Sequence, residues 1–318
     1  MNKRIYFLDV FNEDREMVLN RFPEAIVFNK KLEEEELIEK CKNAEILCIF
    51  ARSKITANVI NSLPDLKIIV TRSVGYDHID LEAANKKNVI IANVPDYGSY
   101  FISEFVFALL LSGLRHIGEG DERVEKKEFS PVGLRGLALK GKTLGVIGTG
   151  KIGQNVTRIA SMGFLMNVLS YDLSPNQELA EENHFSYVDL DTIWKESDII
   201  TLHCPLLPST KHLINEKSFS AMKDGVIIVN TSRGGIIKTK ALVSALRSGK
   251  VSYAFLDVLE HEDNIAKDKE LIEIPNVITT PHIAFYADDS MQKMYDSAFS
   301  SIDAYIKGEE IENKVVGF

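Results

Sequence analysis

Chemically active side chains end three short apolar runs in the second half of the chain. Arg233 follows residues 226–230, acidic residues end and follow the run 254–258, and His282 follows 277–280. Because ligands bind at the carboxyl ends of strands in an open parallel sheet, we expect these groups to converge. Histidine can donate a proton near neutral pH, a carboxylate favours its imidazolium form, and arginine binds a substrate carboxylate. The set predicts proton transfer during the reduction of a ketone.

Other residues compete for these roles. His203 and His261 are alternative proton donors, but Pro281 fixes the loop beside His282 at a strand end, which favours His282. The acidic partner stays open on this evidence. Its candidates are Asp257, Glu260, Glu262 and Asp263. Each group taken alone could equally be structural or solvated, so only the joint placement indicates a site.

A glycine-rich segment predicts a dinucleotide-binding site. Gly148, Gly150 and Gly153 form a G-x-G-x-x-G pattern directly after the apolar run 143–147. The three glycines permit a tight turn, the approach of a pyrophosphate and close packing of the following helix on the sheet. Free N–H groups at the start of that helix attract phosphate. A glycine-rich turn without a ligand is the alternative.

Asp172 indicates which dinucleotide binds. It ends a second apolar run, 19 residues beyond Gly153, where a ribose-binding acid is expected. A carboxylate at this position accepts hydrogen bonds from the ribose hydroxyls and repels a 2′-phosphate. No arginine follows in Leu173–Pro175. The segment therefore favours NAD over NADP.

Short apolar runs alternate with amphipathic segments along the whole chain. Most of the runs are continuous in Val, Ile and Leu, which is typical of parallel strands covered on both faces. The predicted strands are residues 5–10, 46–50, 66–71, 89–93, 143–147, 167–171, 199–203, 226–230, 254–258 and 277–280. The predicted helices between them include 81–87, 154–162, 216–222 and 239–248. This alternation predicts doubly wound α/β sheets.

Two sheets are favoured over one, with a break near residues 95–99. Ser99 can cap a long helix that ends near Leu114, and a loop is expected over 119–131. Residues 286–306 have helical periodicity again, and this last helix could return to pack on the first domain.

Composition excludes several classes of function. The 318 residues include 37 Lys and Arg and 46 Asp and Glu, a net charge of −9, which argues against nucleic-acid binding and anionic membranes. Three cysteines without a C-x-x-C pair indicate neither a disulfide framework nor a zinc site. No signal peptide or membrane-spanning run is visible. We therefore expect a soluble, cytoplasmic protein without a bound metal.

Several motifs, in order, resemble the D-isomer-specific 2-hydroxyacid dehydrogenases. The resemblance covers about residues 66–300. It rests on RSVGYDHID at 72–80, LKGKTLGVIGTGKIG at 139–153, HCPLLPSTKHLIN at 203–215, MKDGVIIVNTSRGGII at 222–237, LDVLEHED at 256–263 and TPHIAFYADDS at 280–290.

The resemblance implies a role for each matched residue. Arg233 would bind the substrate carboxylate and keto oxygen, His282 would be the proton donor in reduction, and Glu262 its partner. The amides of Val74 and Gly75 would hold the substrate carboxylate, and Tyr97 would close the pocket. The residues implied to bind the cofactor are Gly148, Gly150, Lys151, Ile152, Gly153, Asp172, Cys204, Pro205, Thr210, Thr231, Ser232 and Asp257.

The resemblance also implies an architecture. A Rossmann NAD-binding domain, residues 99–286, would be inserted in a flavodoxin-like substrate domain of residues 1–98 plus 287–318. The active site would lie in the cleft between them, and closure would exclude water. Members of the family are commonly homodimers that meet through the NAD-binding domains.

The substrate is less strongly indicated. The segment HIAFYADDS resembles the D-lactate dehydrogenase branch, which favours reduction of pyruvate to D-lactate. Glyoxylate, hydroxypyruvate, 2-ketoisocaproate and phenylpyruvate stay open, because one methylene changes binding by only about 1–3 kcal/mol. The length of the chain disfavours phosphoglycerate dehydrogenases with an appended regulatory domain. Formate dehydrogenases are disfavoured because they have a Gln at the position of Glu262. An NADH-sensing binding protein without turnover is the alternative of another class.

Overall fold

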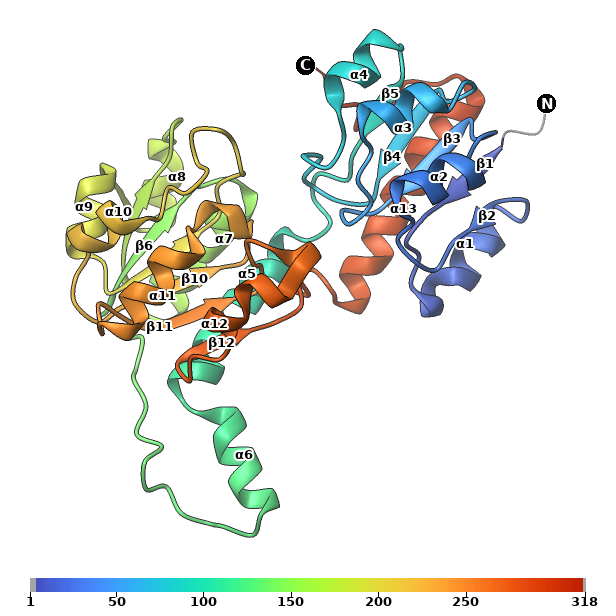
Figure 1. Cartoon of the computed structure of the whole chain (residues 1–318). Coiled ribbons are helices and arrows are strands. Elements are labelled where there is room, and N and C mark those ends of the chain that lie inside the picture. Colours follow the sequence, from blue (N-terminus) through green and yellow to red (C-terminus); the bar gives the residue numbers. More distant parts are fainter. Residues whose placement is uncertain (1–3, 317–318) are drawn as a thin grey trace. The chain divides into compact units, whose positions relative to one another are not determined.

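The computed structural model describes residues 4–316, which form two compact units (Figure 1). Unit 1 combines the N-terminal part up to Gly98 with the C-terminal part from Ala287, and unit 2 runs from Ser99 to Tyr286. Residues 1–3 and 317–318 of the predicted substrate domain lie outside the described residues. Each unit is built on one parallel sheet flanked by helices, which confirms the predicted fold class.

Unit 1 has five parallel strands in the order β2-β1-β3-β4-β5, the flavodoxin-like order. The strands are β1 (Ile5–Phe7), β2 (Ile26–Val27), β3 (Ile46–Ile49), β4 (Ile68–Thr71) and β5 (Ile90–Ala92). Every residue of β3 and β4 is buried, so continuous apolar runs are required there.

The helices of unit 1 include one from the far end of the chain. They are α1 (Arg15–Arg21), α2 (Glu34–Lys40), α3 (Ala57–Ser62), α4 (Leu81–Lys86) and α13 (Asp288–Lys307). In Figure 1, α13 (red) lies beside the blue strands of unit 1. It packs on β4, burying Met294, Tyr295 and Phe299. The prediction that the last helix returns to the first domain is confirmed.

Unit 2 has seven parallel strands in the order β12-β11-β10-β9-β6-β7-β8. They are β6 (Thr143–Ile147), β7 (Asn167–Tyr171), β8 (Ser186–Tyr187), β9 (Ile199–Leu202), β10 (Val226–Asn230), β11 (Val251–Leu256) and β12 (Val277–Thr279). Counted from β6, this is the Rossmann order with one added strand. The order reverses between β6 and β9, where ligands of such sheets bind.

The helices of unit 2 cover both faces of its sheet. They are α5 (Ser99–Leu114), α6 (Ile117–Glu125), α7 (Lys151–Arg158), α8 (Gln177–Glu182), α9 (Leu190–Glu196), α10 (Glu216–Ala221), α11 (Thr239–Arg247) and α12 (Lys269–Ile272). Within residues 4–316, no single helix has the length and apolar character needed to cross a membrane. Among the described helices, α5 and α6 are the one pair that meets the test together, across a bend of 56°.

Two predictions around α5 were wrong in detail. The expected loop over 119–131 begins as α6, where Glu119 pairs with Arg123 at 2.7 Å and Glu122 with Lys126 at 2.5 Å. Such pairs, four residues apart, stabilise a helix that has no buried face. Ser99 is the first residue of α5 and does not precede it as a cap.

Candidate active site

The carboxyl ends of β10, β11 and β12 carry the residues predicted to do chemistry. These strands are neighbours and run parallel, so their ends lie along one edge of the sheet of unit 2. Arg233 lies in the turn after β10, Glu262 begins a 3-10 helix after β11, and His282 follows β12.

His282 and Glu262 are in direct contact. The Nδ1 atom of His282 lies 3.1 Å from Oε2 of Glu262, and both side chains are partly open to solvent, at 33% and 43% of their surface. The Leu259 N–H approaches the other Glu262 oxygen at 3.3 Å. With Nδ1 engaged by the carboxylate, Nε2 is the nitrogen through which His282 can exchange a proton with a ligand.

Asp257 holds the histidine segment in place. Its buried carboxylate accepts hydrogen bonds from the Thr280 hydroxyl at 2.5 Å and from the N–H groups of Ile283 and Ala284 at 2.8 and 2.9 Å. His282 has a left-handed backbone, with φ of +56°, and its N–H donates to the Asp257 carbonyl at 2.9 Å. Burial raises the pKa of Asp257 above its ordinary value, because it outweighs these hydrogen bonds, which act to lower the pKa. The predicted contact of Asp257 with the cofactor stays a prediction.

The competing histidines have other partners. Desolvation lowers the pKa of His203 to about 3, and its Nε2 lies 2.9 Å from the Thr201 hydroxyl, so it stays neutral near pH 7. His261 is paired with the buried Asp268 at 2.9 Å. The His261 side chain is 36% exposed, but its acidic partner is fully buried, whereas Glu262 beside His282 is 43% exposed.

A buried asparagine shapes the turn that carries Arg233. Asn230 ends β10, its Oδ1 accepts the Ser232 N–H at 3.0 Å, and its Nδ2 donates to the Arg233 carbonyl at 2.9 Å. The next residue, Gly234, packs so closely on the acidic segment that a Cβ atom would come within 1.9 Å of the Leu259 carbonyl oxygen. The arginine turn and the acidic segment therefore meet backbone to backbone.

The glycine-rich loop has the geometry of a phosphate-binding turn. Gly148 has φ of +95°, and a Cβ at Gly153 would lie 2.0 Å from the Gly148 carbonyl oxygen, so both positions require glycine. Nothing lies within 4 Å of a Cβ built on Gly150. Lys151, Ile152 and Gly153 form the first turn of α7, the end at which a helix presents its backbone N–H groups.

Asp172 lies at the end of β7 beside this loop. Its Oδ2 accepts the Thr149 N–H at 2.6 Å, and its Oδ1 accepts the Ser174 N–H at 2.9 Å. Burial opposes ionisation, but these hydrogen bonds outweigh it and hold the pKa of Asp172 below its ordinary value. The side chain is therefore a carboxylate at neutral pH.

The remaining predicted cofactor residues cluster after β9 and β10. The Ser232 hydroxyl donates to the Cys204 carbonyl at 2.6 Å, and the Thr210 hydroxyl donates to the Pro205 carbonyl at 2.6 Å. Thr231 is buried, and its hydroxyl finds no partner within the described part of the chain. The open space over Gly150, the ionised Asp172 and this unpaired hydroxyl fit a dinucleotide.

In unit 1, the loop of Val74 and Gly75 presents free amides. The carbonyl groups of this loop accept hydrogen bonds. The Ser73 carbonyl accepts the Val94 N–H at 3.0 Å, and the Val74 carbonyl accepts Nδ2 of Asn93 at 2.8 Å. The Gly75 carbonyl accepts the Ser73 hydroxyl at 2.6 Å. Across residues 4–316, no acceptor takes the N–H of Val74 or Gly75. Such a turn can bind an anion. Tyr97 is buried, and its carbonyl lies 3.5 Å from the Ser290 hydroxyl.

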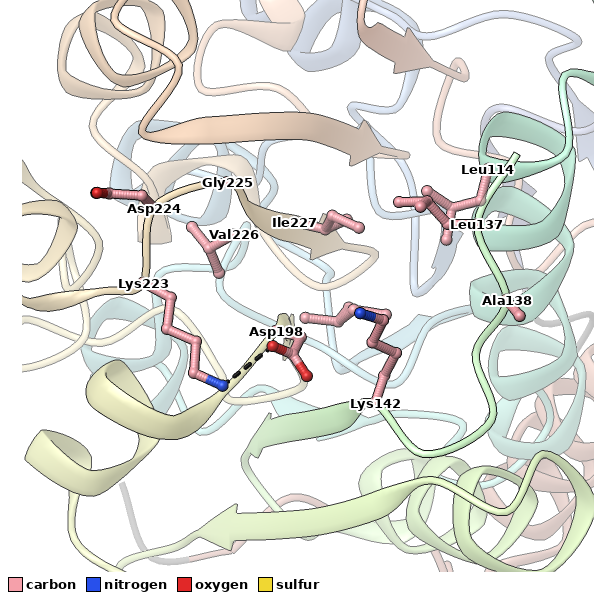
Figure 2. Close-up of a pocket in the computed structure, with 11 residues that line it drawn as sticks. Leu114, Leu137, Ala138, Lys142, Asp198, Lys223, Asp224, Gly225, Val226 and Ile227 are labelled. Carbon is pink, nitrogen blue, oxygen red and sulfur yellow. Dashed lines mark hydrogen bonds and ion pairs between the residues drawn. The ribbon is translucent and has the colours of Figure 1, made fainter. Parts of the chain in front are cut away.

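A cavity of about 170 Å³ lies at the opposite edge of the sheet of unit 2 (Figure 2). It is lined by residues at the amino ends of β6, β9 and β10, and Lys223 in its wall pairs with Asp198 at 3.0 Å. Because ligands of these sheets bind at the carboxyl ends, we assign it no part in the active site.

Sequence reasoning missed the residues that hold this site together. Asn93, Gly234 and Thr280 contact segments that are distant in sequence, and Asn230 shapes the turn that follows it. A polar residue that ends an apolar strand, as Asn230 does, is the one local signal that could have found them.

Comparisons with known proteins agree with this geometry. Residues 107–284 match the model of the D-isomer specific 2-hydroxyacid dehydrogenase, NAD binding domain. The chain is 38% identical to 2-hydroxyacid dehydrogenase homolog 2 of Schizosaccharomyces pombe, over 85% of each chain, and 38% identical to a hydroxypyruvate reductase of Thermotoga maritima, over 92% of this chain and 94% of the other. The structure of D-lactate dehydrogenase from Aquifex aeolicus with NAD and lactic acid has a TM-score of 0.90 and 35% identity, covering 99% and 100% of the two chains.

Proposed function

The chain belongs to the D-isomer-specific 2-hydroxyacid dehydrogenases, which are NAD-dependent oxidoreductases, and within this family we propose that it reduces pyruvate to D-lactate. The contact between His282 and Glu262 at the end of β12 carries the proposal, because reduction of a keto group needs a proton donor there. The similarity to a D-lactate dehydrogenase over nearly the whole chain supports the substrate.

Different residues of unit 2 carry out different parts of the reaction. Arg233 binds the carboxylate of the 2-keto acid, and Glu262 contacts Nδ1 of His282 and orients its ring. His282 gives its proton to the carbonyl oxygen as the carbonyl carbon gains a hydride, so that the ketone becomes an alcohol. NADH supplies the hydride when it is bound. The Gly148–Gly153 loop would hold its phosphates and Asp172 its ribose hydroxyls.

Further residues are proposed for the substrate and the cofactor. The free amides of Val74 and Gly75 would bind the substrate carboxylate, and Tyr97 would close the pocket. Cys204, Pro205, Thr210, Thr231, Ser232 and Asp257 would contact the cofactor.

An aromatic residue beside His282 supports a small substrate. The buried Phe285 ring lies edge-on to the imidazole, with the ring centroids 6.3 Å apart. This ring fills space next to the proton donor, which favours a methyl group on the 2-keto acid over a branched or aromatic one. Hydroxypyruvate, named for the relative from Thermotoga maritima, is the second candidate because its side chain is also short.

We also propose a homodimer formed through unit 2. The segment after α6 exposes apolar side chains, with Phe129 at 94% and Val132 at 79% of their full surface. In Figure 1, α6 and this segment extend away from the sheet of unit 2. A second copy of the chain would cover them.

The cysteines Cys41, Cys48 and Cys204 are free and buried, which fits a reducing cytoplasm.

Initial rates of NADH oxidation with a panel of 2-keto acids test the substrate. The panel is glyoxylate, pyruvate, hydroxypyruvate, 2-ketoisocaproate and phenylpyruvate, with NADPH beside NADH and the handedness of each product determined. We expect the highest kcat/KM with pyruvate and NADH, giving D-lactate. A preference for a bulky acid would contradict the substrate but keep the reaction class, and NADH binding without turnover of any acid would indicate a sensor.

A further inference from the structure

We infer that Glu260 and His212 form a positioning pair for the reaction. Their contact joins the loop after β9, the turn that carries Arg233 and the segment that carries Glu262. The inference rests on the proposed roles of Arg233 and Glu262. Neither Glu260 nor His212 is proposed to touch the substrate or the cofactor.

The pair bridges two segments that are distant in sequence. Oε1 of Glu260 lies 2.5 Å from Nε2 of His212, and Oε2 accepts the N–H of Thr239, at the start of α11, at 2.9 Å. Burial opposes ionisation of Glu260, but the bonds from Thr239 and His212 outweigh it and hold its pKa below the ordinary value. Both carboxylate oxygens of Glu260 are thus engaged. The Glu260 side chain is only 18% exposed and the His212 side chain 33%.

His212 is also tied to the arginine turn. Its N–H donates to the Gly235 carbonyl at 2.9 Å, and its own carbonyl accepts Nδ2 of Asn215 at 2.8 Å. Its backbone is left-handed, with φ of +53°, a conformation that persists only where surrounding contacts impose it. A displacement of the His212 ring would therefore move the turn that carries Arg233.

A second pair fixes the residue next to Glu260. The N–H and Nδ1 of His261 lie 2.9 Å from the two oxygens of Asp268, which is fully buried, and the Thr239 hydroxyl lies 3.3 Å from the same carboxylate. Glu260 and His261 are thus both anchored immediately before Glu262. Glu262 itself is exposed, and these two anchored neighbours help to fix its position.

A double-mutant cycle in the full-length enzyme tests the pair. We expect Glu260→Gln and His212→Gln each to lower kcat/KM for pyruvate about tenfold, through both a lower kcat and a higher KM. The kcat/KM of the double variant should be no lower than that of the less active single variant, because the two residues act as one unit. The dissociation constant of NADH, measured by fluorescence, should change less than kcat/KM does, since the glycine loop and Asp172 lie on other strands.

The matched control is the pair of Asp198 and Lys223. Asp198 likewise joins a side-chain nitrogen, that of Lys223 at 3.0 Å, to a backbone N–H, that of Thr143 at 2.9 Å, but at the opposite edge of the sheet (Figure 2). Asp198→Asn and Lys223→Gln should lower the melting temperature without changing the kinetics of the folded enzyme.

Three results would overturn the inference. It fails if Glu260→Gln and His212→Gln behave like the control, if their effects simply add in the double variant, or if NADH binding accounts for the whole loss. If Glu260→Gln does not fold, the His212→Gln variant is compared with the control and its NADH binding is measured, and the same results then overturn the inference. An inactive wild-type enzyme, or an Arg233→Ala variant with full activity, would instead contradict the proposed function.

Discussion

At the residue scale, the contact between His282 and Glu262 predicts a loss of activity when the carboxylate is removed. Nδ1 of His282 lies 3.1 Å from Oε2 of Glu262, which orients the imidazole ring. Glu262→Gln removes this charged partner, so kcat for pyruvate should fall while the affinity for NADH stays unchanged. Steady-state kinetics and NADH titrations of the two enzymes check this. An unchanged kcat would mean that Glu262 is not the partner of His282.

Asp257 predicts a defect that acts through the backbone. In Asp257→Asn, the amide NH₂ would face either the Ala284 N–H, or the Ile283 N–H and the Thr280 hydroxyl, where the carboxylate accepts hydrogen bonds. The mismatch should lower the free energy of unfolding by about 1–3 kcal/mol and displace His282. Urea denaturation and kcat measured on the same preparation test both effects. Unchanged values in both would refute the anchoring role.

The residue scale also separates what sequence can and cannot reveal. Arg233, Glu262 and His282 are chemically distinctive and follow strands, so their convergence on one sheet edge could be predicted. Asn230 and Asp268 work by hydrogen bonding to backbone groups three and seven residues away, in turns that exist only in the folded chain. Residues of this kind carry no signal in their type alone.

At the element scale, two glycines between β6 and the first turn of α7 have different roles. Gly153→Ala would place a methyl group 2.0 Å from a backbone oxygen, so it should lower both the melting temperature and the affinity for NADH. Gly150→Ala meets no atom within 4 Å and should fold normally, but its methyl would occupy the space proposed for the pyrophosphate. Thermal melts and NADH titrations distinguish the two. Normal NADH affinity in Gly150→Ala would contradict the proposed phosphate site.

The elements differ in how well sequence predicts them. Buried strands such as β10 were predicted at their observed bounds, because both faces must be apolar. The edge strands β2 and β8 have two residues each and were missed, since so short a run gives no pattern. Helix α6 gives no clear helical pattern in the sequence, because Gly118 and Gly120 interrupt it and it has no apolar face to bury.

At the scale of the whole molecule, the exposed apolar side chains after α6 predict an oligomer. Phe129→Glu would place a charge in the proposed contact between two copies, and the protein should change from a dimer to a monomer. Sedimentation velocity measures this, with Lys127→Glu as a control charge nearby. A wild-type enzyme that is monomeric at micromolar concentration would exclude the proposed dimer.

The division into two parallel sheets was predictable because strands and helices alternate through the chain. The return of α13 to unit 1 was also expected, from its helical periodicity after the last strand. What sequence could not supply is the pairing of loops within unit 2. Contacts such as that between Gly234 and Leu259 follow from the order of the strands in the sheet.

The most direct test of the account compares pyruvate reduction by the wild-type enzyme and by His282→Gln. NADH binding is measured by fluorescence on the same preparations. We predict that the variant binds NADH with unchanged affinity while kcat falls by about 10²–10⁴, the contribution of a general acid. A variant that keeps its kcat within a few-fold of the wild-type value would contradict the assignment of His282 as the proton donor.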